Sequence, residues 1–202
     1  MYNAISDYGL IGDTHSTALI DRTGSIDWLC WPRHDSPSVF ARLLDDRKGG
    51  FCAIVVDGTV EHSRRYLPGT NILETRFESA SGVAVLLDLM PVHPPETLPD
   101  EGPDGEIESR LIRILTCESG TVSGRFQIRP AFDYGRAGST LTVADDSVLF
   151  TSKDQALRAS GTHPLGIEGD TAVAAFELTT GQRSILVPVS YTHLTLPTIY
   201  SV

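Results

Sequence analysis

The chain has 202 residues, of which 41% are hydrophobic and 21% charged, and its net charge is −10. No apolar run approaches the roughly 20 residues of a membrane span, and no basic face of the kind that binds nucleic acid or a membrane is visible. The first residues lack the pattern of a secretory signal. The cysteines, Cys30, Cys52 and Cys117, are widely spaced, so we expect buried free thiols in a cytoplasmic protein.

The first predicted elements form a β-hairpin. Apolar alternation predicts strands over 17–21 and 25–30, separated by a turn at 22–24. In a regular strand Ile26 and Trp28 share one face. We therefore expect Trp28 to lie in the core.

The second strand leads into a polar loop that carries the other tryptophan. Trp31 precedes Pro32, and a residue before proline favours an extended conformation. We expect Trp31, Arg33 and Asp35 to line an exposed loop at one end of the domain, where an indole can stack on a sugar and charged groups can bond its hydroxyls. The alternative is that Trp31 packs on the element that follows.

That next element is predicted to be a short helix over residues 37–45. Ser36 can cap it and Pro37 fits its first position. Apolar residues then repeat with helical spacing. These residues are Phe40, Leu43 and Leu44.

Strand follows strand through the rest of the chain, at intervals of about 8–12 residues with turn signals between them. The predicted strands cover 51–56, 59–67, 71–79, 83–90, 109–119 and 121–130, with shorter segments near Leu141, Val148, Leu157, Val173 and Ile185. This spacing predicts an all-β fold, a large antiparallel sandwich of two facing sheets.

An acidic segment, Glu96 to Glu108, interrupts the strands and carries six acids and no base. Its Pro and Gly content indicates a solvated loop. As a calcium loop it fails, because the twelfth position is Leu111 instead of Glu. The six histidines share no metal-ligand spacing, so we expect neither a metal nor another cofactor.

Three segments resemble bacterial glycoside hydrolase family 15 proteins, which include glucoamylase-like and trehalase-like enzymes. They read "IGDTHSTALIDRTGSIDWLCWPRHDSPSVFARLLDDRKGGFCAI", "RRYLPGTNILETRFESASGVAVLLDLMPVH" and "IRPAFDYGR", in the order of that family. The sequence departs from the family's pattern at His34, where Phe is usual, and at Ala131, where a basic residue is common. With His34 in place of Phe, the sequence provides no phenyl ring for stacking at this position.

The resemblance implies that residues 1–188 are the N-terminal β-sandwich of an inverting α-glucoside hydrolase. In that family the catalytic glutamates lie on a following (α/α)6 barrel, and no helical repeat pattern follows Pro188. We therefore expect a non-catalytic accessory domain whose partner is its own C-terminal catalytic domain, with an α-glucoside as substrate of the whole enzyme. The candidate substrate-binding or domain-interface residues are Trp31, Arg33, His34 and Asp35.

The last residues differ in composition from the rest. Residues 189–202 contain no acid, lysine or arginine. One choice of codons for Val189 to Thr198 resembles read-through of a transposon-type sequencing adapter. We therefore expect a non-native tail over 189–202 that does not belong to the fold.

Two other functions remain open from the residues alone. One is a free-standing carbohydrate-binding module, and the other is a sugar epimerase-like sandwich with its own acid and base. Glu74, Arg76 and Arg113 lie on predicted strands. Glu74 and Arg76 are two residues apart, however, which is typical of a surface or cross-strand ion pair.

Overall fold

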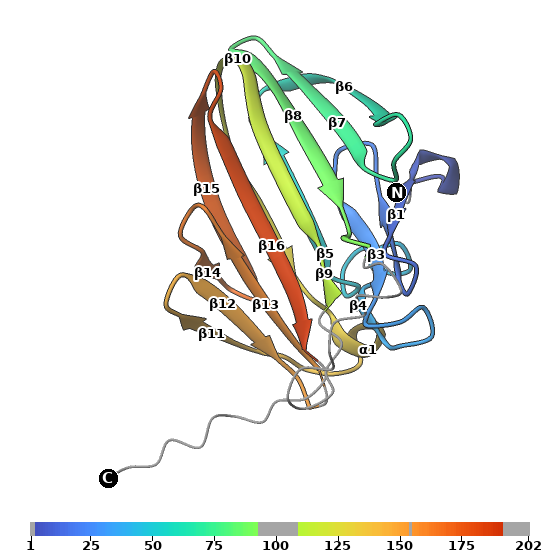
Figure 1. The fold of residues 1–202 in the computed structure, drawn as a ribbon. Coiled ribbons are helices and arrows are strands. Elements are labelled where there is room, and N and C mark those ends of the chain that lie inside the picture. Colours follow the sequence, from blue (N-terminus) through green and yellow to red (C-terminus); the bar gives the residue numbers. More distant parts are fainter. Residues whose placement is uncertain (1–2, 93–108, 154, 192–202) are drawn as a thin grey trace.

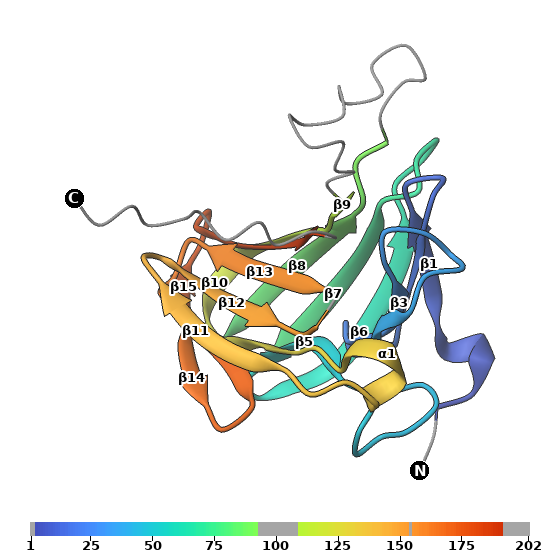
Figure 2. The same ribbon diagram turned by 90° about the horizontal axis from the view of Figure 1, so that it is seen from below.

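The structure is a computed structural model that describes residues 3–92, 109–153 and 155–191 (Figure 1). Two curved sheets face each other, and a view turned by 90° shows them enclosing the core (Figure 2). Every strand pair in the described residues is antiparallel. The predicted all-β sandwich is confirmed.

The first sheet has the strand order β1-β2-β3-β5-β10-β15-β14, with β4 beside β3. Its strands are β1 (Gly9–Gly12), β2 (Thr17–Ile20), β3 (Ile26–Cys30), β4 (Ser38–Phe40), β5 (Phe51–Val56), β10 (Ile112–Arg129), β14 (Gly166–Glu168) and β15 (Thr171–Thr179). The predicted hairpin is confirmed as the pair β2 and β3.

The second sheet has the order β6-β7-β8-β10-β16-β13-β12-β11, with β9 beside β16. Its further strands are β6 (Thr59–Tyr66), β7 (Leu73–Ser79), β8 (Gly82–Leu89), β9 (Ser109–Arg110), β11 (Thr140–Ala144), β12 (Ser147–Thr151), β13 (Ala156–Gly161) and β16 (Arg183–Tyr191). Two short helical turns, η1 (Ile5–Asp7) and α1 (Phe132–Gly135), complete the described elements.

The long strand β10 belongs to both sheets. Its first half pairs with β8 and β16, and its second half pairs with β5 and β15. The change of sheet falls at Gly120, which has a φ of +70°. A Cβ at this position would lie 2.2 Å from the carbonyl oxygen of Ser81, so only glycine fits the crossing.

A buried ion pair connects the two sheets. Arg113 on β10 donates from Nε to Oδ1 of Asp88 at 2.7 Å, and both side chains are fully buried. The same guanidinium donates to the carbonyl oxygen of Cys52 on β5, at 2.7 Å, and to that of Gly24 in the turn between β2 and β3. Arg113 is therefore part of the core and not of an accessible acid/base pair.

The outer face of β7 carries the ion pairs expected there. Leu73, Thr75 and Phe77 are buried while the residues between them are partly exposed. Glu74 pairs across the strands with Arg65 at 2.6 Å. Its neighbour two residues on, Arg76, pairs with Glu78 at 2.8 Å and with Glu118.

The prediction of a helix over residues 37–45 is wrong. Ser38–Phe40 form β4, which pairs with the end of β3, and turns follow it. A helix this short has little stability of its own, whereas all three residues of β4 become buried by pairing. The short turn α1 lies elsewhere in the chain, and its residues Asp133 and Tyr134 have left-handed φ values of 49° and 59°.

The three cysteines are free and buried, as predicted. In the described residues no helix is long and apolar enough to cross a membrane. The acidic segment 96–108 lies outside the described residues. Of the expected tail, Val189 to Tyr191 continue β16 and pair with β13 and β9, so the strand extends three residues past the expected boundary. Residues 192–202 lie outside the described part.

Candidate functional site

A β-bulge in β3 decides where the two tryptophans lie. Leu19 is opposite Trp28, but Ile20 is opposite Ile26, so β3 has one residue more than β2 in this interval. The extra residue shifts the alternation of faces. Ile26 and Leu29 are fully buried, while Trp28 between them is only half-buried.

The bulge reverses the predicted places of Trp28 and Trp31. Leu29 and Trp31 are two residues apart and therefore share the inner face, and Trp31 has 0% exposure within the core cluster. The expectation that Trp31 lines an exposed loop is wrong, and so is the expectation that Trp28 lies in the core.

The other three candidate residues are exposed and lie together. Arg33, His34 and Asp35 form one wall of a shallow depression of about 230 Å³. Thr14 and His15, from the turn between β1 and β2, form the other wall. The sequence does not reveal this second wall, because no pattern in it places the two turns side by side.

Backbone and side-chain contacts join the two walls. The amide of His34 donates to the carbonyl oxygen of His15 at 3.0 Å, and Nδ1 of His34 lies 3.3 Å from the hydroxyl of Thr17. Arg33 donates to Asp35 at 3.0 Å and lowers the pKa of that carboxyl. The depression thus offers donors and acceptors that can bind hydroxyl groups, but no indole.

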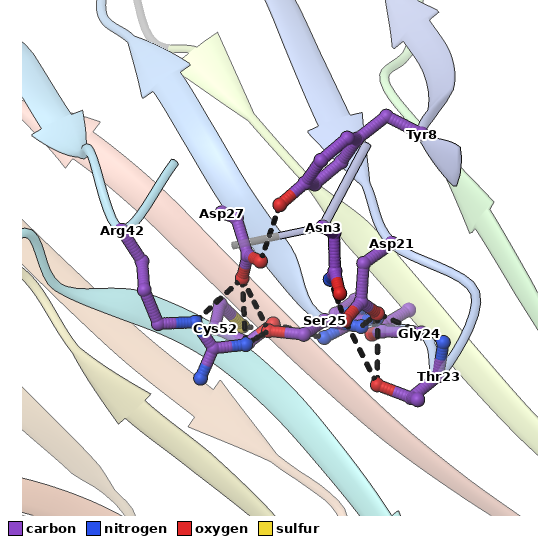
Figure 3. A network of polar contacts seen from close by, with 10 residues as sticks. Asn3, Tyr8, Asp21, Thr23, Gly24, Ser25, Asp27, Arg42 and Cys52 are labelled. Carbon is purple, nitrogen blue, oxygen red and sulfur yellow. Dashed lines mark hydrogen bonds and ion pairs between the residues drawn. The ribbon is translucent and has the colours of Figure 1, made fainter. Parts of the chain in front are cut away.

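At the start of β3, a polar network surrounds Asp27 (Figure 3). Its carboxylate accepts hydrogen bonds from the hydroxyl of Tyr8 at 3.1 Å, the hydroxyl of Ser25 at 2.7 Å and Nε of Arg42 at 2.9 Å. Burial raises the pKa of Asp27. The pKa of Tyr8 is raised to about 12, first by burial and second by the negative charge of Asp27.

A second carboxylate in the network closes the hairpin turn. Asp21 accepts hydrogen bonds at 2.8 Å from the amides of Thr23 and Ser25, and Nδ2 of Asn3 donates to it at 3.2 Å. Such side-chain-to-backbone bonds are typical of Asp in turns. Both carboxylates therefore stabilise strands and turns.

An apolar row crosses the outer face of the first sheet. Leu10 on β1 is opposite Leu19 on β2, and Leu19 is opposite Trp28 on β3. The ring of Trp28 lies 6.2 Å from that of Tyr134 in α1. Leu10 is 52% exposed and Tyr134 is 38% exposed. We call Leu10, Leu19, Trp28 and Tyr134 the outer apolar row.

The two ends of the outer apolar row are fixed by polar contacts. At one end, the hydroxyl of Tyr66 accepts from the amide of Leu10 and donates to its carbonyl oxygen, both at 2.8 Å. At the other end, the amide of Tyr134 donates to Oγ of Ser38 at 2.9 Å, and the guanidinium of Arg136 lies 5.3 Å from the Tyr134 ring. The row is therefore held in place on the sheet.

Across the described ranges, no group of three or more His, Cys, Asp or Glu side chains is placed to hold a metal ion.

Comparison with known proteins gives a consistent result along the chain. Residues 2–189 match the family described as "Trehalase-like, N-terminal". The chain is 34% identical to a trehalase of Mycolicibacterium smegmatis, over 97% of this chain and 31% of that protein. It is 37% identical to trehalase 1 of Sulfolobus acidocaldarius, over 70% of this chain and 22% of that protein. The chain thus spans about a third or less of the length of these relatives.

Proposed function

Because the chain belongs to the trehalase-like N-terminal family, we propose that it is the non-catalytic N-terminal domain of a longer α-glucoside hydrolase. In this proposal it packs on a C-terminal catalytic domain with an (α/α)6 fold. The observation that carries the proposal is the pair of coverages: 97% of this chain aligns with a trehalase, but with only 31% of it.

The contacts of the buried carboxylates support a structural role for this domain. Asp88 is held by Arg113, and Asp27 is held by Arg42 and Tyr8. Hydrolysis of a glycosidic bond requires an acid and a base on either side of a space for the sugar. Asp88 and Asp27 are instead occupied by partners of the fold itself.

The depression at Arg33, His34 and Asp35 is the place where this domain would edge a sugar pocket of the whole enzyme. Its exposed guanidinium and carboxylate are suited to sugar hydroxyls. The burial of Trp31 removes the stacking ring expected at this edge of the pocket, so only polar contacts to the sugar remain in the proposal. Binding of a glucan by this chain alone would favour the free-standing carbohydrate-binding module instead.

Three forms of the protein test the proposal: this chain, the whole natural protein, and the whole protein without residues 1–188. We expect glucose release from trehalose or another α-glucoside by the whole protein, and none by this chain alone. The shortened form should lose solubility or activity because its packing surface is exposed. Glucose release by the purified chain, or full activity and stability of the shortened form, would contradict the proposal.

A further inference from the structure

The side of the sandwich formed by β11 and β14 is open, and we propose that two copies of the protein associate there by pairing their β11 strands antiparallel. This inference is independent of the proposed function. Among the described strands, β11 pairs only with β12, so its other edge is unpaired. Figure 2 shows β11 and β14 on the side of the molecule opposite to β1.

The opposite side of the sandwich, between β1 and β6, is closed by side chains. The hydroxyl of Tyr66 on β6 bonds both the amide and the carbonyl oxygen of Leu10 on β1. Asn71, which follows β6, donates from Nδ2 to the carbonyl oxygen of Gly12 at 2.5 Å. The strand β6 also carries charged residues, which hinder pairing with another chain. These two edges are therefore protected.

The free edge of β11 lacks such protection, because the strand contains no charged residue and no proline. Ala144 and Ser147 flank a two-residue turn, and such flanking residues form a hydrogen-bonded pair. Hydrogen-bonded pairs alternate along a strand, so Leu141 and Val143 direct their N–H and C=O groups away from β12. The other short edges, β4, β9 and β14, are at most three residues long. The edge of β11 is thus the one best suited to pairing.

Apolar side chains that face the space between the sheets are uncovered at this side. Leu141 packs against the core cluster, and Val143 lies two residues on, hence on the same face, but is 53% exposed. On β14, Ile167 is directly opposite the fully buried Ala172 and shares its face, yet Ile167 is 39% exposed. A further strand beside β11 would cover Val143.

A second copy of β11 fits this edge in a symmetric register. With Thr142 opposite Thr142 of the second copy, all five residues of the strand overlap. Leu141 is then opposite Val143 of the second copy, and the two residues exchange both backbone hydrogen bonds. The threonines at the two-fold axis form a favourable cross-strand pair. Pairing uses the free edge of both copies, so the assembly closes as a dimer.

The charges near β11 are also compatible with this register. Asp145 and Asp146 lie in the turn after β11. In the symmetric register they come beside Ser139 and Gly138 of the second copy, so no like charges are directly opposite. The net charge of −10 on each copy opposes association, and we therefore expect salt that screens this charge to favour the dimer.

Cysteine cross-linking tests the register. Thr142→Cys places two thiols opposite each other at a pair without hydrogen bonds, where Cβ atoms lie about 5 Å apart and a disulfide can form after a small shift. Thr140→Cys and Ala144→Cys are matched controls, because both positions are exposed on the same strand but lie opposite each other and not opposite themselves. The native cysteines are buried and should not cross-link.

With oxidised glutathione as the oxidant, Thr142→Cys should form a covalent dimer at least about tenfold faster than either control alone. We expect this in the present chain and in the whole natural protein. A mixture of Thr140→Cys and Ala144→Cys should restore the cross-link. Equal cross-linking by all three single variants, or none by Thr142→Cys, would overturn the inference.

A second measurement uses the mass in solution at protein concentrations up to the millimolar range. Val143→Lys places a charge at the shared edge and should convert the dimer to a folded monomer. Val60→Lys is the control, since Val60 is 81% exposed on β6, and it should leave the dimer intact. A monomeric unsubstituted chain, or a dimer that survives Val143→Lys, would contradict the proposal.

Another part of the whole protein is the competing occupant of this edge. In that case the whole protein would be monomeric, and its Thr142→Cys thiol would react with a maleimide much more slowly than the same thiol in the present chain. This result would overturn the inference and leave the proposed function standing.

Discussion

At the residue scale, the fully buried Trp31 should contribute more to stability than the half-buried Trp28. Trp31→Ala leaves a cavity among core side chains, and we expect a loss of about 3–5 kcal/mol in the free energy of unfolding. Trp28→Ala removes a partly exposed ring and should cost about 1–2 kcal/mol. Urea unfolding of both variants measures the difference. Equal losses would contradict the structure.

Tyr8 should make stability depend on alkaline pH. Its pKa is raised from 10 to about 12 in the folded state, first by burial and then by the charge of Asp27. The unfolded chain therefore loses this proton at lower pH than the folded chain, and the stability present below pH 10 is lost as the pH rises toward 12. Tyr8→Phe removes this loss.

The test compares the unfolding free energy of the unsubstituted chain and Tyr8→Phe between pH 8 and about pH 11. Above pH 10, the free energy of unfolding of Tyr8→Phe should rise relative to that of the unsubstituted chain. Tyr66→Phe is a suitable control, since Tyr66 bonds only the backbone of Leu10. A constant difference for Tyr8→Phe would show that its hydroxyl titrates normally.

The β-bulge in β3 explains why alternation in the sequence predicted the faces of some side chains correctly and those of others wrongly. Alternation along β7 predicted the shared face of Glu74 and Arg76, because that part of β7 pairs in a continuous register with β8. In β3 the extra residue depends on the pairing with β2, and no signal within 25–30 reveals it. Arg113 was also missed, because the sequence does not show that Asp88 lies beside it.

At the element scale, the end of β16 can be tested by truncation. Val189 is 8% exposed and pairs with Arg158 and Arg110, so β16 is covered on both edges at this point. A chain that ends at residue 188 should be about 2 kcal/mol less stable than one that ends at 191, since it lacks the buried side chain of Val189 and leaves the edges of β9 and β13 unpaired there. Chemical denaturation measures the difference.

Equal stability of the two truncated chains would show that the fold ends at Pro188. The prediction that 189–202 is non-native stays separate from this result, because any residue except proline makes the same backbone bonds in a strand. The genomic sequence downstream of the Pro188 codon tests it. A natural reading frame that encodes these same residues would contradict it.

Element type was predicted well where turns punctuate alternating segments, as for β5 to β8. It failed at Ser38–Phe40, where capping and spacing signals favoured a helix but pairing with β3 gave a strand. The pairing partner is far from these signals in the sequence. α1 was missed because its backbone has two non-glycine residues with positive φ, which no helical periodicity describes.

At the scale of the whole molecule, the two sheets should unfold together. They share β10, and Arg113, paired with Asp88, bonds Cys52 in the first sheet and Gly24 in the turn between β2 and β3. Tryptophan fluorescence reports on the first sheet, where both tryptophans lie, whereas far-UV circular dichroism reports on both. We expect coincident transitions by the two methods. Separate midpoints would mean that the sheets are independent units.

The sandwich class was predictable from strand spacing, but the order of strands was not. Non-neighbours in sequence, such as β5, β8, β15 and β16, meet along β10, and a sequence pattern contains no information on which strands pair. The depression has the same origin: its two walls come from separate turns that the hairpin of β2 and β3 brings together.

The partners of Arg113 have a consequence for the synthesis of the protein. Gly24, Cys52 and Asp88 all leave the ribosome before Arg113 does. Until β10 emerges, Asp88 has no guanidinium to neutralise it, and an unpaired buried carboxylate is strongly unfavourable. Nascent chains that end before β10 should therefore remain unfolded. Both sheets should fold only when β10 has been synthesised.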